Sequence, residues 1–142
     1  MRQRKPRHHR RVVSRPERRT SKFGGHVTMM ISVVIPVLNE ARTIGGCLAH
    51  LRSLNHHPDV IVVDGGSTDG TLEIARAFPE VTTLESPQGR GCQMNRGADV
   101  ARSDILFFLH ADTRLPRGGL IAIEHLMAKG NGIAGGSFFY RV

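Results

Sequence analysis

Three short polar segments hold the residues of this sequence that are best suited to chemistry. They cover residues 36–40, 64–69 and 110–113, and each follows directly on a run of apolar residues. In the second segment, Asp64 precedes the loop GGSTDG, which contains Ser67 and Asp69. A carboxylate there can accept hydrogen bonds from a base or ribose, while glycines let the backbone approach a ligand and the next helix offers its N terminus to anions. The alternative is a tight strand-to-helix turn in which Asp69 or Ser67 only caps the helix.

The third segment has the residue types of a cation site. Asp112 lies two residues after His110, at the end of the apolar run ILFFL. Such a carboxylate suits a hard divalent cation, Mg²⁺ or Mn²⁺, which would bridge the protein to phosphate oxygens and neutralise charge on a leaving diphosphate. The alternative is that Asp112 caps a turn before Pro116 and that His110 is a partly buried polar residue.

Arg90 is a further candidate for phosphate binding, because it lies in the glycine-rich stretch QGRG ahead of a predicted helix. A solvated surface arginine is the alternative. The sequence lacks the GxGxxG fingerprint and the lysine of a phosphate-binding P-loop after its strands, so both of these nucleotide motifs are disfavoured.

Alternating apolar runs and helical patterns predict the elements that position these residues. We expect strands at 31–36, 60–63, 81–84 and 105–109, helices at 40–54, 71–78, 91–102 and 116–129, and a strand-like segment at 133–142. Asn39 should cap the first helix, and Met94, Ala98 and Ala101 should line one side of the third. This order predicts an α/β fold with a mostly parallel sheet flanked by helices on both faces. In such sheets ligands bind at the carboxyl ends of the strands, where all three polar segments lie.

The excess of positive charge lies at the beginning of the chain. The first 22 residues hold ten of the 20 Lys and Arg and one of the 12 acidic residues, so the net charge of +8 does not belong to the folded part. We therefore expect residues 1–29 to be a basic disordered extension and residues 30–142 to be the folded domain. No specific nucleic-acid partner is expected. Weak electrostatic contact of the extension with RNA or with an anionic membrane surface stays open, as does a start of translation at Met29 or Met30.

The sequence favours a cytoplasmic protein, with the inner membrane face as the place of any peripheral contact. The extension lacks the apolar region of a secretory signal, and no run of eighteen apolar residues occurs. The two cysteines, Cys47 and Cys92, are expected to be reduced thiols.

Four motifs together carry a family resemblance: ISVVIPVLNEARTI, VIVVDGGSTDGT, SPQGRGCQMNRGADVARSDILFFLHADTRLP and GGSFFYRV. They resemble the family-2 glycosyltransferases of GT-A fold, and among these the bacterial subgroup of the arsenosugar-biosynthesis type. The resemblance implies an inverting, metal-dependent transfer from a nucleotide-diphosphate sugar, first of all a UDP-sugar, to an acceptor that the sequence does not identify.

The resemblance also assigns roles to residues. Pro36, Asn39 and Glu40 would border the base and ribose, and Asp64 would contact the base. Ser67 and Asp69 would lie on the loop beneath the nucleotide. The Asp-x-Asp motif that binds the metal and diphosphate maps onto residues 110–112, with Asp112 as the metal ligand and His110 near the ribose or metal.

Two departures from the family pattern leave alternatives open. His110 replaces the usual first aspartate of the metal motif, and the chain ends soon after the GG of Gly135 and Gly136. The catalytic residue is therefore unknown: we expect a C-terminally truncated chain whose general base lies beyond Val142. An inactive donor-binding fragment is one alternative. A nucleotidyltransferase is another, although its glycine-rich loop is missing from the slot PVLNEART.

Overall fold

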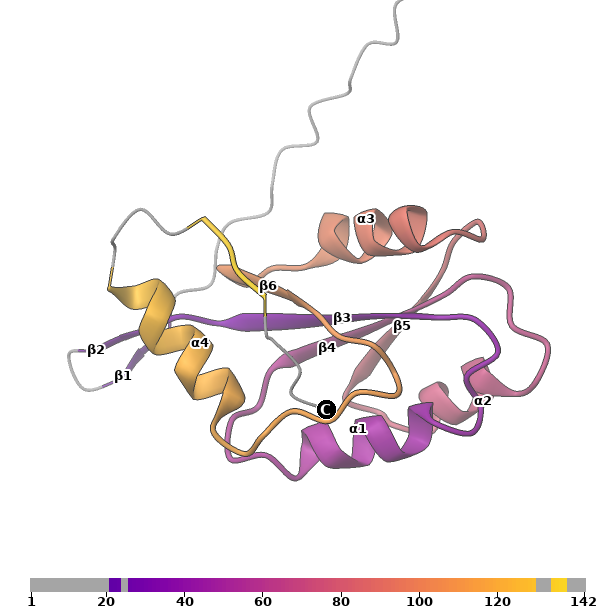
Figure 1. The fold of residues 1–142 in the computed structure, drawn as a ribbon, viewed down its shortest axis with the longest axis horizontal. Helices are drawn as coiled ribbons and strands as arrows, with labels where there is room; N and C mark the ends of the chain where they lie inside the picture. Colours follow the sequence, from indigo (N-terminus) through magenta and orange to yellow (C-terminus); the bar gives the residue numbers. More distant parts are fainter. Residues whose placement is uncertain (1–20, 24–25, 130–133, 138–142) are drawn as a thin grey trace, which may run out of the picture.

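The fold is built on a four-stranded parallel sheet, seen in a computed structural model that describes residues 21–23, 26–129 and 134–137 (Figure 1). The strands are β3 (Ile31–Val37), β4 (Asp59–Asp64), β5 (Val81–Glu85) and β6 (Ile105–Phe108). Their order in the sheet is β5-β4-β3-β6, and every neighbouring pair is parallel. The predicted α/β fold with a parallel sheet is confirmed, and each strand begins and ends within one residue of its predicted bounds.

Helices cover both faces of this sheet. They are α1 (Ile44–Arg52), α2 (Thr71–Arg76), α3 (Arg90–Val100) and α4 (Gly119–Ala128). Figure 1 shows α3 on one face, and α1 and α2 on the other. Alternate residues of β3 enter the two cores: Val33 and Ile35 join the cluster with α1, whereas Val34 joins the cluster on the α3 side. Because both faces are buried, β3 reads as a continuous apolar run rather than an alternating one.

The strand order changes direction beside β3. From β3 the chain steps to β4 and then β5, and the next crossover returns it to β6 on the other side of β3. Ligands in open α/β sheets bind at such a switch point, outside the carboxyl ends of the strands. The edge at which the four strands end, called the carboxyl edge below, is therefore the place for a functional site.

The first helix begins later than predicted, and its predicted cap is wrong. Asn39 does not cap α1; Thr43 occupies the N-cap position, without a capping hydrogen bond from its side chain. Asn39 instead has a φ of 54°, in the left-handed region that asparagine tolerates better than most residues. Hydrogen bonds to the loop after β4 hold the chain in this path, as described below.

The other helices differ from prediction mainly at their ends. Helix α4 begins at Gly119, because Pro116 precedes it in a turn whose carbonyl accepts a bond from Gly119 N at 2.8 Å. Helix α2 ends at Arg76, two residues before its predicted end. No helix in the described part of the chain is long and apolar enough to cross a membrane.

Two short strands lie within the predicted extension. Strands β1 (Ser21–Phe23) and β2 (His26–Thr28) pair antiparallel, apart from the main sheet. Residues 1–20 lie outside the described residues, so the expected disorder there stays a prediction. Of the strand-like segment expected at 133–142, only residues 134–137 are described, and they form no strand.

Candidate functional site

All three polar segments lie at the carboxyl edge. Segments 36–40, 64–69 and 110–113 follow β3, β4 and β6, which are parallel and adjacent in the order β4-β3-β6. Asp64 and Asp112 therefore leave the sheet at the same edge, with β3 between them. The last rungs confirm this alignment: Gly65 N bonds Val37 O, and Leu109 N bonds Val34 O, each at 3.0 Å.

The loop after β3 is bonded to the loop after β4 through Asn39. Its backbone N donates to Ser67 Oγ at 2.9 Å, and its side-chain Oδ1 accepts from Thr68 N at 2.9 Å. With this unusual φ, Asn39 both donates to and accepts from the other loop, although Asn39 and Ser67 are 28 residues apart in sequence. This contact brings the first two predicted segments together.

A second set of bonds joins the same two loops through Thr71 and Asp69. Glu40 N donates to the buried Thr71 Oγ1 at 2.8 Å, and Ala41 N donates to Asp69 Oδ2 at 3.0 Å. Asp69 also accepts from Thr71 N and, through a very short bond, from the Thr71 hydroxyl. The Thr71 hydroxyl, followed by Ala41 N, lowers the pKa of the Asp69 carboxyl. Residues 38–41 and 65–71 are called the paired loops below.

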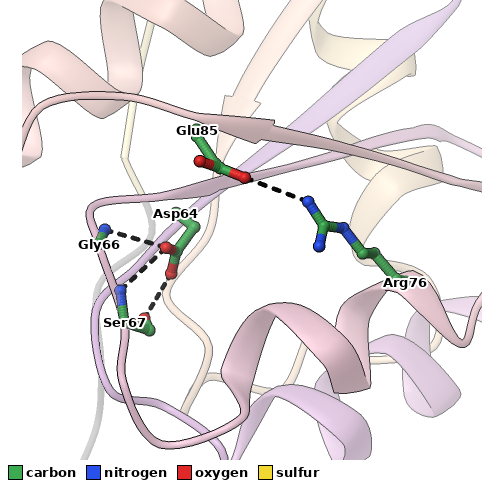
Figure 2. Close-up of polar contacts among 5 residues, drawn as sticks. All are labelled: Asp64, Gly66, Ser67, Arg76 and Glu85. Atoms are coloured by element: carbon green, nitrogen blue, oxygen red, sulfur yellow. Dashed lines mark hydrogen bonds and ion pairs between the residues drawn. The ribbon is translucent and has the colours of Figure 1, made fainter.

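Asp64 orders the loop that follows it (Figure 2). Its side chain is 2% exposed, and Oδ2 accepts from Gly66 N and Ser67 N, each at 2.9 Å. Its Oδ1 accepts from the Ser67 hydroxyl. Both oxygens of this carboxylate accept hydrogen bonds from its own loop, so its expected contact with a base stays a prediction.

The remaining residues near the paired loops have simpler surroundings. Pro36 is half-buried within β3, and the Glu40 carboxylate accepts from Thr43 Oγ1 at 2.6 Å. Figure 2 also shows Arg76 of α2 reaching Glu85 at the end of β5, at 3.1 Å. Both of these side chains are more than half exposed, so this ion pair is a surface contact of small energetic value.

The loop after β6 presents its polar residues to solvent. Leu109 and Ala111 are buried in the core, whereas His110 and Asp112 between and after them are exposed. A turn closes the loop, with Thr113 N donating to His110 O at 3.0 Å. Alternation between core and solvent thus places the imidazole and the carboxylate outward at the carboxyl edge.

Asp112 lies on the α1 side of the sheet, since its neighbour Ala111 packs in the same core cluster as Ile44 and Leu48 of α1. Burial and then the nearby carboxylate of Asp112 raise the pKa of the Cys47 thiol to about 11, against an opposing effect of Arg114. Asp112 is therefore near α1, whereas the exposed Arg90 begins α3 on the opposite face. Arg90 and Asp112 would flank the strand ends from two sides.

The described residues contain no group of three His, Cys, Asp or Glu side chains that could hold a metal ion by themselves. His110 and Asp112 offer two potential ligands at most. This number fits Mg²⁺ or Mn²⁺ bound with the help of ligand phosphates and water, since such ions commonly take only one or two protein carboxylates.

Sequence reasoning missed two residues that shape the carboxyl edge, Thr71 and Gln93. Gln93 is 4% exposed and donates from Nε2 to Val37 O at 2.7 Å and to Val63 O at 2.9 Å. The buried residues of α3 are Gln93 and Gly97, whereas the predicted Met94, Ala98 and Ala101 are only half-buried. A buried polar residue carries no apolar periodicity, so only the four-residue spacing from Gly97 could have indicated it.

Two proteins similar to the chain in sequence are glycosyltransferases. The chain is 37% identical over 100 residues to a PGL/p-HBAD biosynthesis glycosyltransferase of Mycobacterium tuberculosis, a match that covers 66% of this chain and 39% of the relative. It is 40% identical over 91 residues to the glycosyltransferase AglE of Haloferax volcanii, covering 58% of this chain and 30% of that protein. The chain therefore spans well under half the length of these relatives.

Solved structures share the fold. A mannosyltransferase from Pyrobaculum calidifontis in complex with GDP-Man and Mn²⁺ is similar with a TM-score of 0.63 and 28% identity, over 70% of this chain and 32% of that one. Glucosyl-3-phosphoglycerate synthase from Mycobacterium tuberculosis with Mn²⁺, UDP and glucosyl-3-phosphoglycerate has a TM-score of 0.54 and 27% identity, over 61% and 36% of the two chains. The sequence model of the family "Glycosyl transferase family 2" matches residues 32–142. With that match over most of its length and the GT-A type of sheet that it shares with these enzymes, the chain belongs to glycosyl transferase family 2.

Proposed function

We propose that this chain forms the donor-binding part of a glycosyltransferase that uses a nucleotide-diphosphate sugar and a divalent cation. The observation that carries the proposal is the strand order β4-β3-β6, because it brings the paired loops and the exposed His110 and Asp112 to one edge of the sheet. The solved relatives that contain Mn²⁺ with GDP-Man or UDP support this combination of ligands.

Asp112 is the proposed metal ligand, with His110 beside it. An exposed carboxylate can bind a cation without losing an existing hydrogen bond to the core; its one described partner is Thr113 Oγ1 at 3.3 Å. When bound, Mg²⁺ or Mn²⁺ would neutralise negative charge that develops on the leaving diphosphate. Arg90 and the N terminus of α3 would add positive potential on the other side of the strand ends.

The base and ribose are assigned to the paired loops. Pro36, Asn39 and Glu40 would border them from the β3 side, and Ser67 and Asp69 would support them from the β4 side. Asp64 would contact the base, for which the Ser67 hydroxyl has to turn away from Oδ1. The loops are already bonded to each other at four backbone positions, so they can receive a nucleotide with little loss of conformational entropy.

The finer features of the reaction are also proposals. We infer an inverting displacement with a UDP-sugar donor, in which an acceptor hydroxyl attacks the anomeric carbon from the side opposite the diphosphate. The position of His110 in the metal motif supports a relationship to the arsenosugar-biosynthesis type of glycosyltransferase. We assign no general base among the described residues.

The test is titration of the full 142-residue chain with UDP and with GDP, each with and without Mn²⁺, by calorimetry. We expect one of these diphosphates to bind in a cation-dependent manner, and Asp112→Asn to weaken that binding by roughly tenfold or more. Asp99→Asn, which removes an exposed carboxylate from α3, is the matched control and should bind as the wild type does. Equal affinity of Asp112→Asn and wild type in Mn²⁺ would refute the assigned metal ligand.

A further inference from the structure

Gln93 is a buried residue whose hydrogen bonds reach the carboxyl edge. It comes from α3, yet its side chain reaches the end of the sheet, where it bonds the carbonyls of Val37 and Val63. Val37 is the last residue of β3 and Val63 is the next-to-last residue of β4. One amide group therefore ties together the two strands from which the paired loops emerge.

We propose that Gln93 is a positioning residue that sets the geometry of the loop 64–67, and through it the donor site of the proposed function. It makes no proposed contact with the nucleotide. Its effect would pass through Gly65, the first residue after β4, which stands between the Gln93 side chain and the loop that Asp64 organises.

The contact with Gly65 is unusually close. A Cβ atom added at Gly65 would lie 3.1 Å from Cδ and Nε2 of Gln93 and 3.3 Å from its Oε1. Gly65 N also donates to Val37 O, the same carbonyl that receives the Gln93 amide. The path of the backbone at Gly65 is thus defined from two directions, and it determines where Gly66 N and Ser67 N point toward Asp64.

The orientation of the amide follows from its partners. Both groups that face Nε2 are carbonyl oxygens, which can only accept hydrogen bonds, so the nitrogen rather than the oxygen must lie against them. Replacing it with a group that cannot donate removes both bonds to buried carbonyls at once. A substitution by methionine keeps nearly the same length and volume while doing so.

Gly97 explains how the Gln93 side chain of α3 can reach the carbonyls of β3 and β4. A Cβ at Gly97 would lie 2.3 Å from Val34 Cγ1, so only glycine allows α3 to approach β3 this closely. Gln93 lies one helical turn before Gly97 and therefore on the same face. The close approach of α3 to β3 at Gly97 therefore brings the Gln93 side chain within hydrogen-bond distance of both strands.

Gln93→Met is the variant that tests the proposal, in the full chain, with Asn95→Met on the exposed side of the same helix as its matched control. Hydrogen exchange is measured residue by residue, together with the affinity for UDP and GDP in Mn²⁺. We expect the amides of Gly66 and Ser67 to exchange about tenfold faster in Gln93→Met, while the central amides of β3 and β4 change far less. Affinity for the diphosphate that wild type binds should fall roughly tenfold, because the loop no longer holds its bound geometry.

Three outcomes separate this proposal from the proposed function. Unchanged exchange at Gly66 and Ser67 would overturn the role of Gln93, whatever happens to binding. An equal acceleration across the whole sheet would also overturn it, since Gln93 would then be an ordinary core residue. If wild type binds neither diphosphate, the proposed donor site fails, while the exchange pattern still decides whether Gln93 positions the loop. Gly97→Ala provides an independent variant, and it should accelerate exchange at the same two amides by pushing α3 away from the sheet.

Discussion

The paired loops and the loop after β6 reach the same edge of the sheet but are built in opposite ways. In the paired loops, the polar side chains of Asn39, Ser67 and Asp69 are occupied by hydrogen bonds within the protein, as is that of Asp64 just before the second loop. In the loop after β6, His110 and Asp112 face solvent, and the loop is anchored by the buried Leu109 before His110 and the buried Ala111 after it.

The two halves of the proposed site therefore use their charges differently. The carboxylates of Asp64 and Asp69 hold the loop backbone in a fixed conformation, to which a nucleotide would bind. The carboxylate of Asp112 has weak partners in the protein and is available to a cation. Substitutions in the two regions should therefore affect different measured quantities.

The largest expected effect on stability comes from Asp64→Ala. The buried carboxylate accepts three hydrogen bonds, and its removal leaves Gly66 N and Ser67 N without their acceptor. We expect the free energy of unfolding, measured by urea denaturation, to fall by about 3 kcal/mol. Asp112→Ala is the control from the other loop and should change it by less than about 0.5 kcal/mol. Similar losses in the two variants would contradict the contrast.

An intermediate effect, confined to acid, is expected from Asp69→Asn. The folded-state pKa of Asp69 lies below its ordinary value of 3.8, so its charged form adds stability that is fully present above that value and is lost as pH falls through the lowered pKa. The stability difference between wild type and variant should therefore be constant near neutral pH and shrink below about pH 4. Urea midpoints measured across this range provide the test, and a difference that grows toward acid would have the wrong sign.

The smallest expected effect is on the reactivity of the Cys47 thiol, which lies near the loop after β6. Cys47 is buried with a pKa of about 11, whereas Cys92 is exposed near the beginning of α3. Because only a thiolate reacts quickly, an aromatic disulfide reagent at neutral pH should label Cys92 and leave Cys47 until the protein unfolds. Cys92→Ser should then show no fast-reacting thiol. Two thiols of equal rate would mean that α1 opens readily beside Asp112.

The strands and their order along the chain could be predicted because a strand that is buried on both faces of a sheet has a continuous apolar run. The run ISVVIPV is buried on both faces of the sheet, and VIVVD ends at Asp64 as expected. The positions of the polar segments at one edge followed from the rule for parallel sheets. The beginnings of α1 and α4 were predicted less well, because Asn39 bonds the loop after β4 instead of capping α1, and Pro116 lies in a turn before α4.

Residue types and spacing by themselves determined the α/β class, the carboxyl edge as the place of the candidate site, and its candidate residues from Pro36 to Asp112. What those residues do in the folded chain depends on contacts between distant segments. Asn39 forms hydrogen bonds with a distant loop rather than with a helix end, and Asp64 accepts bonds from its own loop. Gln93 bonds carbonyls of two strands from the face that α3 covers. The reason is physical: apolar periodicity is a property of neighbouring residues, whereas a buried hydrogen bond depends on partners that come from separate parts of the chain.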